Sequence, residues 1–100
     1  MKARAVIFAP EARDDLMAIY KWIDDVGSPK LAIRYVERIE AYCLGMSHAS
    51  ERGRRRDDVR PGMRAVGFER RATIAFKVED DRVTILRIFH GGRNWEAEFA

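Results

Sequence analysis

Residues 10–46 read PEARDDLMAIYKWIDDVGSPKLAIRYVERIEAYCLGM, and this stretch decides the fold class. Its apolar residues recur at the spacing of one helix face, first after Pro10 and again after Ser28-Pro29. Proline is tolerated in the first turn of a helix, and Gly27 suits a helix end. We therefore predict two helices, the second from about Pro29 to Met46, that meet at a tight turn and pack antiparallel.

The sequence on either side of this stretch predicts strands. Val6-Ile7-Phe8 is typical of a short strand, and after Pro61-Gly62 the apolar residues alternate with period two. The alternation falls into three runs separated by turn residues, which indicates a meander, and the tail is predicted as a short helix or a loop. The expected fold is α+β in one domain over residues 1–100: an amino-terminal strand, an antiparallel helical hairpin packed on a mainly antiparallel three- to four-stranded sheet, and a short carboxyl-terminal tail. The three runs are Met63–Phe68, Arg71–Val78 and Val83–Phe89.

Length and composition exclude several classes of protein. A chain of 100 residues buries roughly 65% of its unfolded surface, which suffices for one small core. No apolar run approaches the roughly 20 residues of a membrane span. The apolar stretch in the start MKARAVIF is too short for a signal peptide. With one cysteine, Cys43, the chain makes no internal disulfide, so we expect a cytoplasmic protein with Cys43 packed as a thiol.

Positive charge is concentrated in one segment. The net charge is +3, yet residues 51–71 alone carry eight arginines against four acidic residues. The run Arg54-Arg55-Arg56 is typical of either a solvated surface loop or a phosphate contact, and Asp57 and Asp58 directly after it favour the loop.

Few residues suit catalysis or a cofactor. The sequence has no HExxH, no paired CxxC and no glycine-rich phosphate loop, so we expect neither a metal nor a nucleotide cofactor. His90 follows an apolar strand and precedes Gly91-Gly92. It is interpreted either as a general base of near-neutral pKa or as a side chain that caps the strand end by hydrogen bonds.

The last predicted strand is apolar on both faces. Val83, Ile85 and Phe89 point to one side by alternation, and Leu86 and Ile88 point to the other. The helical hairpin covers one face, which leaves the other to the tail or to a partner protein. We expect a partner, because an uncovered apolar patch usually marks an interaction site, and we expect arginines to surround the patch. These arginines are Arg64, Arg71 and Arg87.

Three motifs in this order resemble the ParE toxins of the RelE/ParE superfamily. They are F-x-P-x-A-x-x-D-L from Phe8 to Leu16, Pro61-Gly62-x-Arg64, and V-x-I-L-R-I-x-H-G-x-R from Val83 to Arg93. The resemblance implies a small toxin that is neutralised by a ParD-like antitoxin in a hetero-oligomer. It also implies inhibition of DNA gyrase by binding, with no catalytic site, no direct specific DNA binding by the toxin alone and no membrane partner.

Together with the strand pattern, this resemblance assigns candidate contact residues. An acidic and apolar antitoxin segment that folds on contact suits the arginine excess and the two-sided last strand. Target contact is expected from Arg93 and Trp95 in the tail. Antitoxin contact is expected from Arg64, Arg71, Val83, Ile85, Arg87 and Phe89.

The related RelE-type toxins imply an alternative, a ribosome-dependent mRNA endonuclease. In that case the catalytic cluster is Arg64, Arg71, His90 and Arg93. Phe99 stands where such nucleases commonly carry tyrosine, and residues 48–76 contain no lysine, so the nuclease ranks second. A third hypothesis is an inert interaction module.

Overall fold

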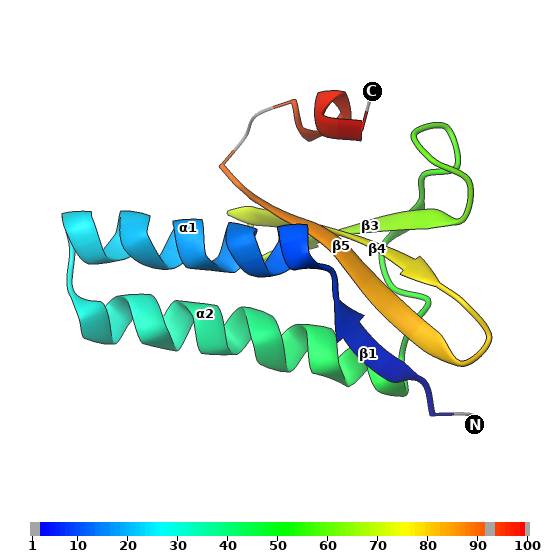
Figure 1. The fold of residues 1–100 in the computed structure, drawn as a ribbon, viewed down its shortest axis with the longest axis horizontal. Coiled ribbons are helices and arrows are strands. Elements are labelled where there is room, and N and C mark those ends of the chain that lie inside the picture. Colours follow the sequence, from blue (N-terminus) through cyan, green and yellow to red (C-terminus); the bar gives the residue numbers. More distant parts are fainter. Residues whose placement is uncertain (1–2, 92–93, 100) are drawn as a thin grey trace.

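Two antiparallel helices pack on one side of a sheet, and a short carboxyl-terminal helix lies on its other side (Figure 1). The computed structural model describes residues 3–91 and 94–99. The described helices are α1 (Pro10–Val26), α2 (Pro29–Leu44) and the 3₁₀ helices η1 (Gly45–Ser47) and η2 (Trp95–Phe99). None of them is long and apolar enough to cross a membrane.

The predicted hairpin is confirmed, and local chemistry explains its ends. Pro10 and Pro29 each stand at the first helical position. The Ser28 hydroxyl accepts a hydrogen bond from the Leu31 N–H at 3.2 Å, and this satisfies one free donor of the α2 amino terminus. Helix α2 ends at Leu44 and continues as η1, which keeps Met46 buried as the helical spacing predicts.

The sheet has five strands in the order β1-β5-β4-β3-β2 within the described residues. Strand β1 runs parallel to β5, and the other neighbours are antiparallel, so the predicted α+β class is confirmed. Strand β2 is the one strand of the sheet that the sequence did not predict. It has two residues and is therefore too short to show the alternation of apolar and polar residues that marks a strand. The strands are β1 (Ala5–Phe8), β2 (Arg54–Arg55), β3 (Met63–Phe68), β4 (Ala72–Val78) and β5 (Arg82–His90).

A β-bulge in β5 overturns the predicted orientation of its side chains. Ala75 pairs with Arg87 and Phe76 with Ile85, which leaves Leu86 as an extra residue. An extra residue reverses the alternation beyond it. Ile88 therefore joins the helix-covered face with Ile85, and Phe89 turns to the other face, opposite to the prediction.

Both faces of β5 are covered by the chain itself, so the prediction of an uncovered apolar patch on this strand is wrong. Val83 and Ile85 have no exposed surface and lie in the core beneath α1 and α2. Phe89 is 1% exposed and lies in a second cluster with Met63 and Ala75. The tail packs over this second cluster, which was the alternative covering that the sequence offered.

The turn between β3 and β4 is strained. Glu69 and Arg70 have φ angles of 50° and 60°, in the left-handed region that non-glycine residues rarely adopt. The Glu69 carboxylate accepts two hydrogen bonds from the Arg38 guanidinium of α2, at 2.8 and 3.0 Å. This bidentate pair ties the turn to the hairpin and helps to hold the unusual backbone.

Candidate functional site

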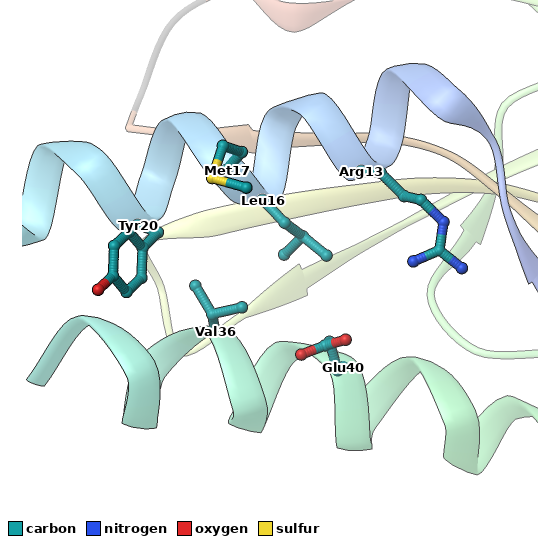
Figure 2. A pocket seen from close by; sticks show the side chains of 6 residues that line it. All are labelled: Arg13, Leu16, Met17, Tyr20, Val36 and Glu40. Atoms are coloured by element: carbon teal, nitrogen blue, oxygen red, sulfur yellow. The ribbon is translucent and has the colours of Figure 1, made fainter. Parts of the chain in front are cut away.

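An apolar groove runs between α1 and α2 on the solvent side of the hairpin (Figure 2). It encloses a cavity of about 430 Å³. Its apolar lining comes from both helices, and Met17 keeps 57% of its surface exposed. Figure 2 shows Arg13 and Glu40 on facing helices at one end and Tyr20 at the other. The apolar lining residues between them are Leu16, Met17 and Val36.

The spacing of α1 explains why this groove exists. Ala12, Leu16 and Ile19 form the buried stripe of α1, whereas Arg13, Met17 and Tyr20 follow one position later along the helix. A second stripe at the same period lies beside the first on the helix surface. The apolar face of α1 is therefore wider than its contact with the sheet requires, and the excess borders solvent.

The tail builds a second cluster of functional interest on the opposite face of the sheet. The Trp95 ring stacks on Phe89 with centroids 5.8 Å apart, and the Phe99 ring meets Phe89 edge-on at 6.1 Å. The Arg56 guanidinium lies 5.0 Å from the centroid of Trp95 and forms an ion pair with Glu96 at 3.2 Å. Trp95 is thus a partly buried anchor of the tail in this structure.

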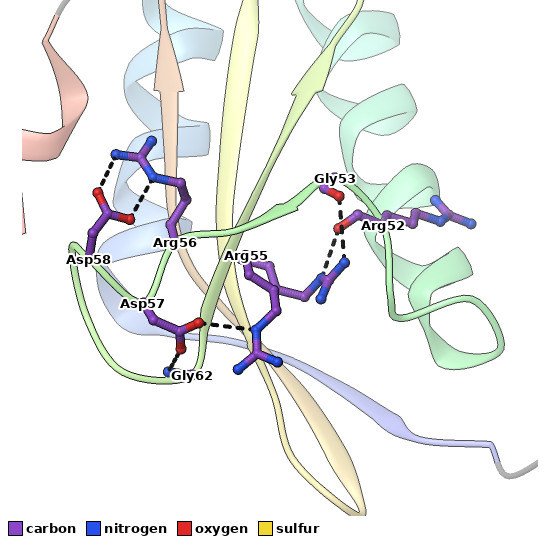
Figure 3. A network of polar contacts seen from close by, with 8 residues as sticks. Arg52, Gly53, Arg55, Arg56, Asp57, Asp58 and Gly62 are labelled. Atoms are coloured by element: carbon purple, nitrogen blue, oxygen red, sulfur yellow. Dashed lines mark hydrogen bonds and ion pairs between the residues drawn. The ribbon is translucent and has the colours of Figure 1, made fainter.

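Two arginines of the arginine-rich segment are paired with the carboxylates that follow them (Figure 3). Arg55 pairs with Asp57, and Arg56 pairs with Asp58, each at 3.0 Å. A hydrogen bond from the Gly62 N–H and the Arg55 partner lower the pKa of Asp57, and the Arg56 hydrogen bond lowers that of Asp58. Among the ion pairs of the described residues, none involves Arg54, which is exposed.

Among the described residues expected in a nuclease cluster, Arg64 lies apart from His90. His90 packs among rings of the helix side, with centroids 5.0 Å from Trp22 and 5.8 Å from Tyr35, and burial lowers its pKa. Arg64 donates to the Arg52 carbonyl at 3.0 Å. Arg64 faces Phe76 on β4 whereas His90 faces Ala72, four residues further along, or about 13 Å at the rise of a strand. Arg71 is exposed near His90, and Arg93 lies outside the described residues.

The arginines expected to surround one patch lie in three different environments. Arg64 is on the helix side near the Gly53 backbone, and Arg71 is exposed beside the β3–β4 turn. Arg87 is bound by Asp15 of α1, at 2.8 Å from Nε and 2.9 Å from Nη2. Since Val83, Ile85 and Phe89 are also buried, these six residues do not form the predicted antitoxin surface.

Sequence reasoning missed both Asp15 and the groove. Asp15 is 13% exposed and accepts a third hydrogen bond from the Ile88 N–H at 2.8 Å. No local pattern reveals a partner 72 positions away. The sequence did contain a signal for the groove, because Met17 and Val36 widen the apolar stripes of their helices.

Cys43 is a packed thiol in this structure. Burial raises the pKa of the Cys43 thiol to about 12. The described residues hold no cluster of side chains that could bind a metal ion.

Comparison with known families decides the affiliation. The family model "ParE toxin of type II toxin-antitoxin system, parDE" matches residues 6–95. The chain belongs to the ParE toxin family. This ParE-family chain is therefore a toxin-type component of a type II toxin–antitoxin system.

Solved structures agree with the family assignment. A chain of the chromosomal ParDE system from P. aeruginosa is 25% identical, with a TM-score of 0.78, over 90% of this chain and 98% of that one. A chain of the RelBE2 toxin–antitoxin complex from Mycobacterium tuberculosis shares the fold at 23% identity, with a TM-score of 0.65, over 90% of this chain and 93% of that one. No curated protein sequence gives a significant match.

Proposed function

We propose that this ParE-family chain is a cytoplasmic toxin that inhibits DNA gyrase by binding and is neutralised by a ParD-like antitoxin at the hairpin groove. The groove is the observation that carries the proposal. It leaves apolar side chains of α1 and α2 open to solvent, with Met17 57% exposed, in a chain whose strand β5 is covered on both faces. Open apolar surface of this kind is typical of a protein that binds another protein.

The groove suits a helical segment of the antitoxin. From Arg13 to Tyr20 the lining spans eight residues of α1, about 10 Å at the rise of an α-helix, or two turns of a bound helix. A helix in a groove presents apolar anchors at i, i+3 or i+4 and i+7. Arg13 and Glu40 at one end give such a helix a charged contact that selects its orientation (Figure 2). Of the contacts expected from the sequence, exposed Arg71 is retained for a carboxylate of the same antitoxin.

Target contact is assigned to the tail side of the sheet. Trp95 lies on the opposite face from the hairpin, so in this proposal gyrase and antitoxin use different sides of the molecule. Inhibition by binding requires no assembled catalytic cluster, and the separation of Arg64 from His90 is compatible with that. The same separation disfavours the nuclease alternative.

A supercoiling assay tests the proposed target. Purified chain added to DNA gyrase and relaxed plasmid is expected to inhibit supercoiling or to trap cleaved DNA, and to leave ribosome-bound mRNA intact. Trp95→Ala should weaken inhibition by about tenfold if Trp95 is an interface anchor, with Ala97→Ser as the control at an exposed position of the same helix. Unaffected gyrase at high toxin concentration would refute the target, and codon-positioned mRNA cleavage abolished by His90→Ala would establish the nuclease.

A further inference from the structure

The outer edge of β3 is only partly paired. Strand β2 pairs Arg54 with Ala65 and Arg55 with Arg64 and extends no further. It begins at Arg54 because Gly53, at a φ of +67°, turns the preceding chain away. A Cβ atom at Gly53 would lie 2.1 Å from the Ala65 carbonyl oxygen, so only glycine fits this close approach. Beyond this point, residues 66–68 have no neighbouring strand on that edge among the described residues.

The unpaired edge presents one donor and one acceptor at Gly67. The Arg56 N–H donates to the Met63 carbonyl, so Met63 directs its backbone groups toward β2. Alternate residues of a strand direct their backbone groups to the same edge. Gly67 therefore points its N–H and C=O outward past the end of β2. Gly67 is exposed, and a Cβ added there would meet no atom within 4 Å.

A shallow basin adjoins this edge on the tail side of the sheet. Its cavity volume is about 320 Å³. The floor comes from small side chains of β3 and β4, and Trp95 and two arginines form its walls. The lining residues are Arg54, Arg56, Ala65, Val66, Gly67, Thr73 and Trp95.

The charges around the basin favour a peptide over a nucleic acid. Arg56 is already paired with Asp58 and Glu96, whereas Arg54 is exposed and in no ion pair of the described residues. The wall therefore offers one guanidinium outside the ion pairs of the described residues, that of Arg54, beside Arg56, whose single positive charge is matched by two carboxylates. Arg54 and Arg56 together only balance Asp58 and Glu96, so a polyanion with a charge on every residue gains no net attraction here. A peptide can place one carboxylate on Arg54 and keep neutral groups elsewhere.

We propose that the β3 edge and its basin bind an extended acidic peptide segment of a partner protein by strand addition. The segment pairs with residues 66–68, accepts from the Gly67 N–H, donates to the Gly67 C=O and places a carboxylate on Arg54. This surface lies on a different edge and face from the hairpin groove. The inference does not rest on gyrase being the target.

The test titrates the full chain with an acetylated and amidated hexapeptide of alternating Thr and Glu. Fluorescence anisotropy gives the affinity, and ¹⁵N-labelled protein reports the Gly67 amide resonance. The Lys counterpart of the peptide and single-stranded octathymidylate are the comparison probes. Binding of the Glu peptide with a shift of the Gly67 amide is the expected result.

Two pairs of variants separate charge from backbone pairing. Arg54→Glu is expected to weaken binding by about tenfold, whereas Arg34→Glu makes the same charge change on exposed α2 surface and should leave the affinity within about twofold. Gly67→Pro removes the outward N–H without breaking the β3–β4 ladder and should also weaken binding by about tenfold, whereas Gly67→Ala keeps the N–H and has room for its methyl group.

Several outcomes would overturn the proposal. They are no binding of the Glu peptide, equal binding of the Lys peptide, or an unshifted Gly67 amide at saturation. Octathymidylate binding that depends on Arg54 and not on the Gly67 N–H would identify a nucleic-acid surface instead. If Gly67→Pro does not fold, the amide shift in the unmodified chain still decides the question.

Discussion

At the residue scale, Asp15 joins two parts of the fold that are distant in sequence. Strand β1 stops pairing at Phe8 opposite Ile85, so the Ile88 N–H lies beyond the last strand partner on that side. Asp15 accepts this N–H at 2.8 Å and also binds the Arg87 guanidinium through two hydrogen bonds. One carboxylate on α1 thus satisfies both the free edge of β5 and the charge beside its bulge.

Removal of this carboxylate is expected to destabilise the fold. Asp15→Ala leaves the Ile88 N–H without its acceptor and the largely buried Arg87 guanidinium with only Glu98, at 3.5 Å. This should lower the free energy of unfolding by about 3 kcal/mol. Asp14→Ala is the matched control, since Asp14 is exposed on the same helix and its change should stay within about 0.5 kcal/mol. Urea denaturation of the two variants at pH 7 measures the difference, and equal midpoints would contradict this role of Asp15.

At the scale of elements, α1 serves two surfaces. Its Ala12, Leu16 and Ile19 face the sheet, and the parallel stripe that includes Met17 lines the groove with Val36 of α2. The core stripe stabilises the hairpin, so the groove stripe is free to serve recognition. This separation makes binding and stability distinguishable by mutation.

A charge placed in the groove is expected to disrupt antitoxin binding alone. Met17→Asp should weaken binding of the proposed ParD-like antitoxin by at least about tenfold, because a carboxylate would be desolvated among apolar side chains. Leu31→Asp is the control: Leu31 is 56% exposed against 57% for Met17, and it lies about 140° around α2 from Val36. Surface-bound antitoxin titrated with each variant gives the affinities. If both variants bind like the unmodified chain, the groove is not the antitoxin site.

At the scale of the whole molecule, the sheet separates two apolar clusters. The larger cluster lies under the hairpin, and the smaller one, around Phe89, lies under η2 (Figure 1). Ion pairs from Arg56 to Glu96 and from Arg87 to Glu98, at 3.2 and 3.5 Å, also hold η2. The tail therefore has a packing role in addition to any contact with a target.

Truncation after Gly91 is expected to expose the smaller cluster. Loss of the partly buried Trp95 and Phe99 should lower the free energy of unfolding by about 3 kcal/mol and increase binding of an apolar fluorescent dye. Ala97→Ser, which alters an exposed position of η2, is the control. An unchanged unfolding midpoint with no added dye binding would show that η2 does not stabilise the sheet. A toxicity test of the truncated chain is therefore interpreted together with its stability.

The helices and the strand order of the meander were predictable because each depends on neighbours in the sequence. The α1 and α2 stripes repeat within four residues, and Ser28-Pro29 carries its own capping chemistry. The face of Phe89 was not predictable, because the bulge at Leu86 depends on pairing between β4 and β5. The expected antitoxin contacts Val83 and Ile85 failed for the related reason that apolarity does not say which segment covers a side chain.

By itself, the sequence determined the α+β class, the hairpin and the membership of a toxin family that its motifs already resembled, since periodicity, caps and motif order are properties of the chain. Only the tertiary structure decided which apolar residues are left open. It buried Val83, Ile85 and Phe89, and it placed Met17 at a groove and Gly67 at an unpaired edge. Exposure depends on contacts between segments far apart in the chain, and those contacts exist only once the helices and the tail have packed against the sheet.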